Sequence, residues 1–284
     1  MRTDETQKML KNFKMELQLA GYSENTIKNY LYSLNTLHSY VKKDLKKIEE
    51  SDLKRFLSYL QTEKGVKTST IYRHLNAIKT FFRLNDLEVA EKIKLPKLSK
   101  SLPEVLMVDE MRKILNSISN LRDLLIVRLL YASGLRVSEL VGLNRRDIEG
   151  LDLKVIGGKG RKDRVTHIDE TTLNLIQKYL DNRIDKNEAL FINNRGKRLS
   201  QRTVQKIIRK HAKRAGIKKN VTPHTLRHSF ATHLLQNDAD IVVIRDLLGH
   251  SSLSTTQIYT HLTSSYRRKV YKNSHPLSKE HQEI

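Results

Sequence analysis

The chain has 284 residues, of which 53 are Lys or Arg and 31 are Asp or Glu, giving a formal net charge of +22. This excess of positive charge indicates a polyanionic partner such as a nucleic acid, and the alternative is a merely soluble, lysine-rich protein. The absence of cysteine excludes disulfides, thiolate metal sites and cysteine nucleophiles, and with no signal core and no apolar run of membrane length we expect a cytoplasmic protein without a membrane partner.

Residues 1–95 are expected to form a small helical bundle. Four segments repeat apolar residues at intervals of three and four, which is typical of helices that bury one stripe. Gly21 is expected to end the first helix, and Ser23 is placed to cap the second. The four segments are residues 3–20, the stretch from Ser23 to Val41, the stretch from Ser51 to Leu60, and residues 68–84.

Residues 96–104 are predicted to be a linker, because prolines and lysines in this stretch favour an extended, basic chain. Such a segment lets two domains close around a duplex, but it also fits an ordinary domain junction. The linker divides the chain into a domain over residues 1–95 and a second domain over residues 105–284.

The second domain is expected to be rich in helices. Asp109 is predicted to cap a short helix, and residues 121–133 form a nearly all-apolar helix that Gly134 ends. Further elements are predicted at residues 170–182 (helix), 190–192 (short apolar strand) and 200–215 (helix), and in a tail helix from Ser264 that either docks on a neighbouring subunit or frays.

Residues 151–168 predict a β-hairpin with a glycine-rich, basic tip. The alternating residues are Leu153 and Val155 on one arm and Val165 and His167 on the other. The tip is not a Walker loop, because Gly160 rather than Ser or Thr follows Lys159. It is placed to deliver Lys159 to a phosphate, although a solvated basic turn explains the hairpin taken alone.

Two clusters of basic residues are candidate DNA contacts. A run of charge is usually just a solvated face, but the charge of the whole chain favours DNA here. The predicted contacts are Arg202, Lys206 and Arg209 on the helix at 200–215, and Arg161, Lys162 and Arg164 at the hairpin.

Arg136 follows the turn at Gly134 and precedes Glu139 by three residues. This spacing fits an arginine that is held in place for a function. It fits equally an exposed arginine that pairs with Glu139, and the spacing alone does not decide between the two.

The stretch from Val221 to His261 concentrates residues that are suited to phosphate chemistry. Pro223 predicts the start of a helix, so His224 and Arg227 are expected on one face of its first turns. An arginine grips phosphate oxygens with a planar fork and keeps its charge. Beyond a second helix that Gly249 ends come His250 and then Tyr259.

A metal site is not expected among the histidines of this stretch. His224 and His228 have a zinc-like spacing, but Thr225 stands where the metalloprotease pattern needs Glu, and no Cys or nearby carboxylate completes a ligand set. His228 and His233 are instead expected to be core or supporting groups.

Together these motifs resemble the tyrosine recombinase (phage integrase) family, and within it the Xer recombinases, over essentially the whole chain. Five motifs carry the resemblance in the matching order; they are residues 132–140, 158–164, 224–233, 247–250 and 259–261. The lack of cysteine and the lysine-rich linker make the chain similar to the single-protein archaeal type.

The resemblance implies a mainly α fold. The N-terminal bundle corresponds to a SAM-like core-binding domain that clamps DNA, and residues 105–284 correspond to an α-rich catalytic domain with a small sheet and a tail helix. It also implies six catalytic residues, with Glu139 supporting the region of Arg136; the six are Arg136, Lys159, His224, Arg227, His250 and Tyr259.

In the mechanism that the resemblance implies, Tyr259 attacks the scissile phosphate and forms a 3′-phosphotyrosyl bond. Arg136 and Arg227 clamp the non-bridging oxygens. His224 and His250 donate hydrogen bonds to those oxygens, His224 is also placed to accept the proton of Tyr259, and Lys159 protonates the departing 5′-oxygen. No metal, ATP or other cofactor is implied.

The implied partners are a double-stranded recombination site, a cyclic tetramer assembled through the C-terminal tail, and a DNA translocase. The implied role is the resolution of chromosome dimers during chromosome partition and cell division. Three alternatives stay open, namely an integrase or resolvase of a mobile element or plasmid, a basic DNA-binding protein without catalysis, and a type IB topoisomerase that acts as a monomer.

Overall fold

A computed structural model of the protein describes residues 3–94, 96, 104–157, 163–249 and 271. The chain divides into two compact units, Met1–Lys100 and Ser101–Ile284, and the break between them falls within the predicted linker. The fold is mainly helical, as predicted, with one small antiparallel sheet in the described part of the second unit.

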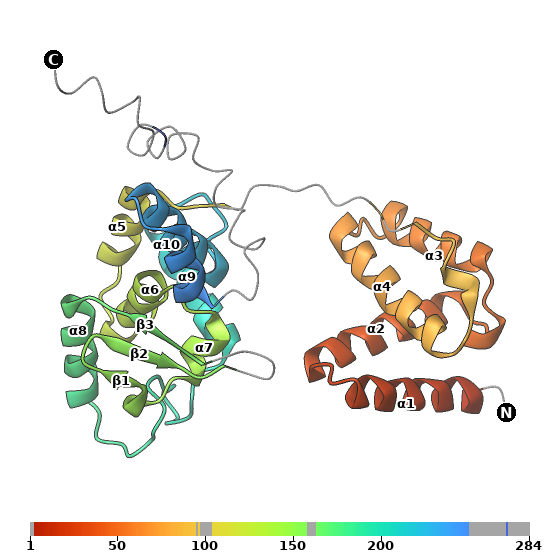
Figure 1. Ribbon diagram of the computed structural model, residues 1–284, viewed down its shortest axis with the longest axis horizontal. Helices are drawn as coiled ribbons and strands as arrows, with labels where there is room; N and C mark the ends of the chain where they lie inside the picture. Colours follow the sequence, from red (N-terminus) through yellow and green to blue (C-terminus); the bar gives the residue numbers. More distant parts are fainter. Residues whose placement is uncertain (1–2, 95, 97–103, 158–162, 250–270, 272–284) are drawn as a thin grey trace. The chain divides into compact units, whose positions relative to one another are not determined.

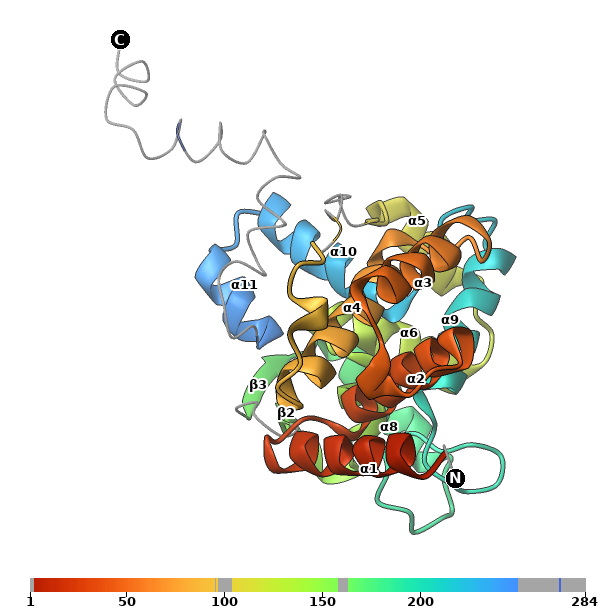
Figure 2. The same cartoon turned by 90° about the vertical axis from the view of Figure 1, so that its right-hand side faces the viewer.

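The first unit is a bundle of α-helices whose core is rich in phenylalanine. α1 lies at one edge of the bundle next to α2, while α4 packs against both α2 and α3 (Figures 1 and 2). Phe13 of α1 meets Phe81 of α4 edge to face, with ring centroids 5.2 Å apart. The elements are α1 (Thr3–Leu19), α2 (Glu24–Val41), α3 (Glu50–Thr62) and α4 (Thr68–Leu84), with 3-10 turns at Leu45–Lys47 and Glu88–Ala90.

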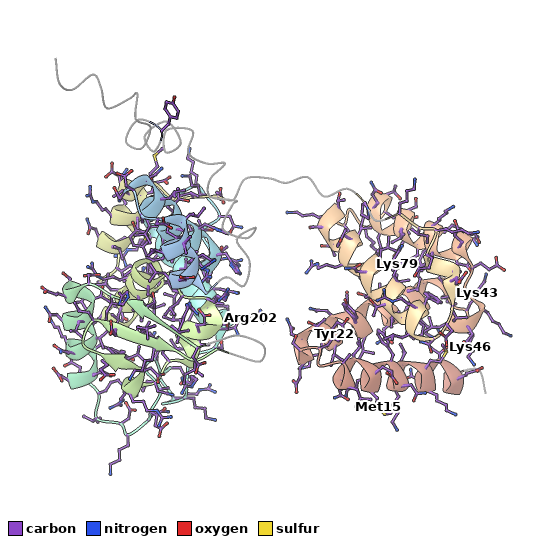
Figure 3. The ribbon with its side chains drawn as sticks, viewed as in Figure 1. Met15, Tyr22, Lys43, Lys46, Lys79 and Arg202 are labelled. Atoms are coloured by element: carbon purple, nitrogen blue, oxygen red, sulfur yellow. The ribbon has the colours of Figure 1, made fainter. Side chains whose placement is uncertain are left out.

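Local capping fixes where these helices begin. The Ser23 hydroxyl accepts the Thr26 amide at 3.1 Å, which confirms the predicted cap of α2. The third helix begins one residue before the predicted Ser51, because the Asp52 carboxylate accepts the Glu49 amide at 3.1 Å. Asp52 is buried and is paired with Lys43, one of the outer lysines labelled in Figure 3.

The second unit is built around α6. This helix contacts α5, α7, α8, α9, α10 and β3 (Figure 1), and most of its apolar side chains are buried, as the predicted all-apolar pattern requires. The sheet has the antiparallel order β1-β2-β3. The elements are α5 (Val108–Asn116), α6 (Leu121–Ser133), α7 (Val137–Gly142), β1 (Ile148–Glu149), β2 (Asp152–Val155), β3 (Arg164–His167), α8 (Glu170–Asp181), α9 (Gln201–Arg214), α10 (Pro223–Gln236) and α11 (Ile241–Leu248), with a 3-10 turn at Arg145–Asp147.

One predicted helix start and one predicted strand need correction. The helix assigned to an Asp109 cap begins at Val108, because the Glu110 carboxylate accepts the Met107 amide at 2.7 Å. Residues 190–192 do not form a strand; isolated bridges join Asn144 to Ala189 and Ile192 to Arg198. The apolar character of this run serves burial in the core instead, since Phe191 is only 2% exposed.

The second arm of the hairpin faces the opposite way from its predicted pattern. The register pairs Leu153 with Thr166 and Val155 with Arg164. Since paired residues share a face of the sheet, Thr166 is buried with Leu153, while Val165 and His167 are exposed. The predicted tail helix, apart from Tyr271, and the hairpin tip lie outside the described residues.

None of the helices in the described residues is long and apolar enough to cross a membrane.

At Gly134, the end of α6 packs closely against α10 and α11. Gly134 has a left-handed φ of 61°, and a Cβ added there would lie 2.5 Å from Cδ1 of Phe230 and 3.0 Å from Cδ2 of Leu248. Gly150 has a similar φ of 59°, but a Cβ added there would meet nothing within 4 Å. The two glycines therefore carry the same backbone strain on substitution and differ in packing.

We expect Gly134→Ala to lower the free energy of unfolding by roughly 2–4 kcal/mol, and Gly150→Ala by about 1 kcal/mol. The difference arises because only the first substitution pushes the Phe230 ring and Leu248 out of place. Urea unfolding of both variants measures it. Equal losses of stability at the two positions would show that the close packing at Gly134 is not needed.

Candidate active site

Arg136 and Glu139 form a closed pair at the start of α7. The Arg136 amide donates to Oε2 of Glu139 at 2.7 Å, and Nη1 of Arg136 donates to Oε1 at 2.8 Å. The Arg136 side chain is 19% exposed. Of the two interpretations left open by the sequence, the structure supports an arginine that is held in place.

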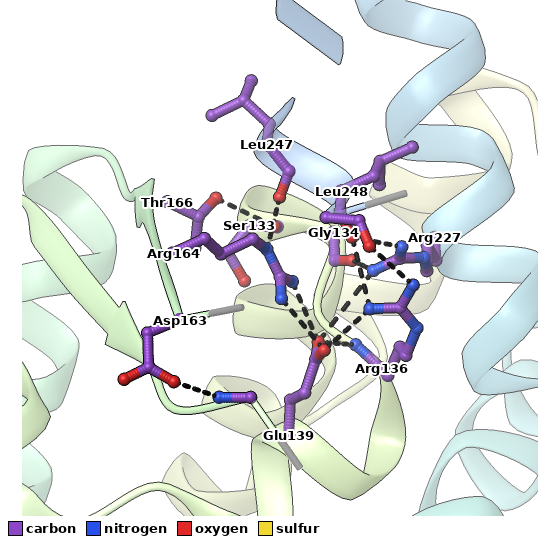
Figure 4. A network of polar contacts seen from close by, with 12 residues as sticks. Ser133, Gly134, Arg136, Glu139, Asp163, Arg164, Thr166, Arg227, Leu247 and Leu248 are labelled. Atoms are coloured by element: carbon purple, nitrogen blue, oxygen red, sulfur yellow. Dashed lines mark hydrogen bonds and ion pairs between the residues drawn. The ribbon is translucent and has the colours of Figure 1, made fainter. Parts of the chain in front are cut away.

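The Glu139 carboxylate also receives Arg164, which enters from the first residue of β3. Nη1 and Nη2 of Arg164 donate to Oε1 and Oε2 of Glu139, each at 2.9 Å (Figure 4). Nη1 of Arg227 lies 4.0 Å from Oε2. One buried carboxylate is thus surrounded by three arginines; we call Arg136, Glu139, Arg164 and Arg227 the arginine cluster.

These surroundings keep Glu139 ionised. Burial alone would raise the pKa of its carboxyl, but the hydrogen bonds from Arg164 and from the amide and side chain of Arg136 lower the pKa from 4.5 to about 2. The carboxylate is therefore charged throughout the neutral pH range, and it offsets part of the repulsion among the three guanidinium groups.

The arginine cluster also binds the C-terminal end of α11. Arg164 Nε donates to the Leu247 carbonyl at 2.8 Å, Arg227 Nη2 to the Leu248 carbonyl at 2.6 Å, and Arg136 Nη2 to the Gly249 carbonyl at 3.1 Å. The last carbonyls of a helix lack partners within the helix, and its C-terminus favours nearby cations. The backbone directly before position 250 is therefore held by arginines, two of which are predicted catalytic residues.

α10 presents His224 and Arg227 to different surroundings. The Thr222 hydroxyl accepts the Thr225 amide at 3.2 Å, and Pro223 occupies the first helical turn as predicted. His224 is exposed, whereas Arg227 is only 4% exposed and also donates to the Gly134 carbonyl.

Of the other two histidines on α10, His228 is partly buried. Burial, followed by the charges of His224 and Arg227, lowers its pKa to about 4, so His228 is neutral at neutral pH. His233 is buried, and its Nδ1 lies 2.8 Å from the Tyr131 hydroxyl. Within the described residues no group of three or more His, Asp or Glu is arranged to hold a metal ion.

Three of the predicted DNA contacts lie on the surface. Arg202, Lys206 and Arg209 are exposed and are spaced along one face of α9, with Arg202 near its start (Figure 3). The predicted DNA contacts Arg161 and Lys162 lie outside the described residues, and so do the predicted catalytic residues Lys159, His250 and Tyr259.

The prediction that Arg164 contacts DNA needs correction. Its side chain is only 10% exposed, and its donors are directed at Glu139 and the Leu247 carbonyl. Sequence reasoning missed this internal role. The alternation of inward and outward residues along the strand could have revealed it, because Arg164 pairs with the buried Val155 and therefore faces the interior.

The depressed pKa of Glu139 makes the second unit sensitive to acid. Its folded pKa of about 2 lies below the ordinary value of 4.5, so its contribution is complete above pH ~4.5 and is lost as the pH falls toward 2. We expect this contribution to be roughly 3 kcal/mol. Glu139→Gln should therefore unfold more easily at neutral pH and lose less further stability between pH ~5 and ~3 than the unmodified protein.

Urea unfolding at a series of pH values tests this expectation. Glu188→Gln, at an exposed position, serves as the control and should follow the unmodified protein. Identical acid profiles for Glu139→Gln and the unmodified protein would contradict the electrostatic role of Glu139.

Known tyrosine recombinases are similar in sequence over nearly the whole chain. The tyrosine recombinase XerA of Pyrococcus horikoshii is 43% identical over 278 residues, which cover 94% of this chain and 93% of the relative. The tyrosine recombinase XerC of Thermodesulfovibrio yellowstonii is 38% identical, covering 97% of this chain and 98% of the relative.

Solved structures of recombinases share the fold. The crystal structure of XerA recombinase is 35% identical with a TM-score of 0.57, covering 96% of this chain and 99% of the other. The XerH site-specific recombinase bound to difH substrate in a pre-cleavage complex is 28% identical with a TM-score of 0.71, covering 87% of this chain and 78% of the other.

Two family models match the chain in succession. The N-terminal SAM-like domain of phage integrases matches residues 9–85, and the phage integrase family matches residues 104–265. The chain therefore belongs to the phage integrase family and is a tyrosine recombinase, an enzyme that cleaves and rejoins DNA strands.

Proposed function

We propose that this chain recombines DNA at a specific site by cutting each strand with Tyr259 and rejoining it to a partner strand. The observation that carries the proposal is the convergence of Arg136 and Arg227 on the end of α11, directly before His250. Two guanidinium groups that are fixed side by side can grip both non-bridging oxygens of one phosphodiester.

The chemistry follows from what the phosphate and the phenol require. A tyrosine hydroxyl has a pKa of about 10, so it becomes a nucleophile at neutral pH only in a positive field with a proton acceptor nearby. Arg136 and Arg227 supply the field and stabilise the charge that develops on the oxygens. His224, exposed on the first turn of α10, is placed to hydrogen bond to the phosphate or to take the Tyr259 proton.

The bonds made and broken balance without a cofactor. Tyr259 Oη forms a bond to phosphorus as the bond to the 5′-oxygen breaks, and Lys159 delivers a proton to that oxygen. The phosphotyrosyl bond keeps the energy of the phosphodiester, so the 5′-hydroxyl of a partner strand can reverse the step. In this scheme His250 donates a further hydrogen bond to the non-bridging oxygens.

We further propose that the recombination site is chromosomal and that the reaction resolves chromosome dimers in the cytoplasm. The proposal rests on similarity to XerA, XerC and XerD recombinases of 37–43% identity over most of the chain. A DNA translocase as activator belongs to this proposal. An integrase or resolvase of a mobile element uses the same chemistry and differs in where its DNA site lies.

Recombination between two sites requires several protomers, and we propose a cyclic tetramer joined by the C-terminal tail. Among the solved structures of similar fold is a lambda integrase tetramer bound to a Holliday junction, at 20% identity and a TM-score of 0.75. On this chain, a pocket of about 420 Å³ is a suitable place to receive a neighbour's tail; its lining combines apolar residues such as Phe230 and Leu234 with polar ones such as Arg128 and Asp169.

Covalent capture tests the nucleophile. A nicked suicide duplex with the host's candidate recombination site, mixed with protein without metal or ATP, should yield a protein–DNA adduct on a denaturing gel. Tyr259→Phe should bind the duplex but yield no adduct, because it lacks the attacking oxygen. An adduct with Tyr259→Phe would exclude Tyr259 as the nucleophile. Tight binding without an adduct from the unmodified protein would favour a non-catalytic DNA-binding protein, and relaxation of supercoils by a monomer would favour a topoisomerase.

The exposed cations of α9 are expected to bind the DNA backbone. Replacing Arg202, Lys206 and Arg209 together with Ala should weaken duplex binding and flatten its salt dependence by roughly one unit of log Kd per log salt for each phosphate that the variant no longer neutralises. A matched triple variant replaces the exposed Lys178, Lys186 and Arg195 with Ala. The same change in slope for both triples would show that α9 is not the contact surface.

A further inference from the structure

Arg164 links three elements that come from separate parts of the chain. It is the first residue of β3, it binds Glu139 at the start of α7, and it binds the Leu247 carbonyl at the end of α11 (Figure 4). Its side chain is only 10% exposed. A buried arginine with a carboxylate and a carbonyl as partners is held in a single orientation.

We infer that Arg164 is a positioning residue for the proposed cleavage reaction, acting through Glu139 on Arg136. This inference rests on the proposed function, since it needs Arg136 to bind the scissile phosphate. Arg164 itself does not touch DNA in this scheme. Its role is to fix the carboxylate that orients the Arg136 guanidinium and to leave that guanidinium available to the phosphate.

The sharing of the Glu139 oxygens explains how this works. Oε1 accepts Nη1 of both Arg136 and Arg164, and Oε2 accepts the Arg136 amide and Nη2 of Arg164. With Arg164 present, two guanidinium groups divide one negative charge. Without it, Glu139 would keep only Arg136 and the more distant Arg227, at 4.0 Å, and would compete more strongly with the phosphate for Arg136.

A lysine cannot replace Arg164 in this arrangement. The planar fork of arginine bridges both carboxylate oxygens while Nε reaches a third acceptor, the Leu247 carbonyl, at 2.8 Å. A lysine ammonium is a single point of charge on a flexible stem. Arg164→Lys therefore keeps the positive charge but not the hydrogen-bond geometry. This variant separates the contribution of the charge from that of the geometry.

The contact of Arg164 with Gly249 is a second observation that points to positioning. A Cβ added to Gly249 would lie 2.9 Å from Cδ and 3.1 Å from Nε of Arg164, so the backbone at the end of α11 lies directly against this side chain. On the strand side, the Thr166 hydroxyl donates to the Ser133 carbonyl at 3.1 Å, which holds β3 against α6. Both the backbone of the strand that carries Arg164 and its guanidinium group are therefore held in place.

The experiment measures covalent cleavage of the suicide duplex in a single turnover at saturating protein, together with the Kd for the same duplex. We expect Arg164→Lys and Arg164→Gln to cleave roughly 10- to 100-fold more slowly, because the Arg136 guanidinium is then misplaced. Their Kd should change by less than about threefold, because the missing interaction acts on the transition state rather than on binding.

Arg183→Lys is the matched control for stability. The side chain of Arg183 is also shielded from solvent, at 6% exposure, and it binds Asp185 and the carbonyls of Ala189 and Leu190 away from the arginine cluster. Arg183→Lys should lose thermal stability to a similar degree but keep the saturated cleavage rate. An equal loss of cleavage in Arg183→Lys and Arg164→Lys would overturn the inference, because the effect would then be one of general stability.

A double variant tests the path through Glu139. If Arg164 acts through this carboxylate, Arg164→Gln with Glu139→Gln should cleave no more slowly than the slower single variant. Fully additive losses would overturn the inference. Failure of the unmodified protein to form an adduct would instead contradict the proposed function, so the two failures are distinguishable.

Discussion

The buried carboxylate of Glu139 is the constraint on which the catalytic unit depends. Three guanidinium groups cannot be gathered in a poorly solvated place without a counter-charge, because each repels the others over a few ångströms. Glu139 supplies that charge, and the hydrogen bonds from Arg136 and Arg164 keep its pKa at about 2. The arginines are consequently in place before any phosphate arrives, so little reorganisation is needed when negative charge develops on the substrate.

The C-terminal end of α11 also holds the three arginines in place. Its last carbonyls accept hydrogen bonds from Arg136, Arg164 and Arg227, so guanidinium donors that would otherwise lie buried without partners are satisfied. The arrangement works only because the backbones approach closely. Gly134 leaves room for Phe230 and Leu248, and Gly249 leaves room for Arg164. Two glycines that look like simple helix ends in the sequence are therefore also packing positions for the arginine cluster.

The sequence predicted those parts of this site that local patterns encode. The run of residues 121–133 predicted the limits of α6, and Pro223 predicted the start of α10. The spacing of Arg136 and Glu139 offered an arginine held in place as one of two interpretations, and this is the one that the structure supports. The position of Arg164 was missed because it depends on register, and a basic residue beside a basic tip looks like part of that tip. Residues 190–192 were wrongly assigned to a strand, since apolar content alone does not reveal whether a run has a neighbouring strand.

In the proposed function, the second unit uses different residues for binding DNA and for the cleavage chemistry. The cations of α9 are exposed, where salt and water weaken each contact and affinity comes from their number. In the arginine cluster, Arg227 is buried and Arg136 and Arg164 are partly buried, so each contact is stronger than at the surface but must be oriented. In the sequence, Lys159 comes five residues before Arg164 and His250 directly follows Gly249, whose backbone lies against the Arg164 side chain. Under the proposed function, we therefore expect a change at α9 to alter the affinity for DNA, and a change at Glu139 or Arg164 to alter the rate of cleavage by the bound protein.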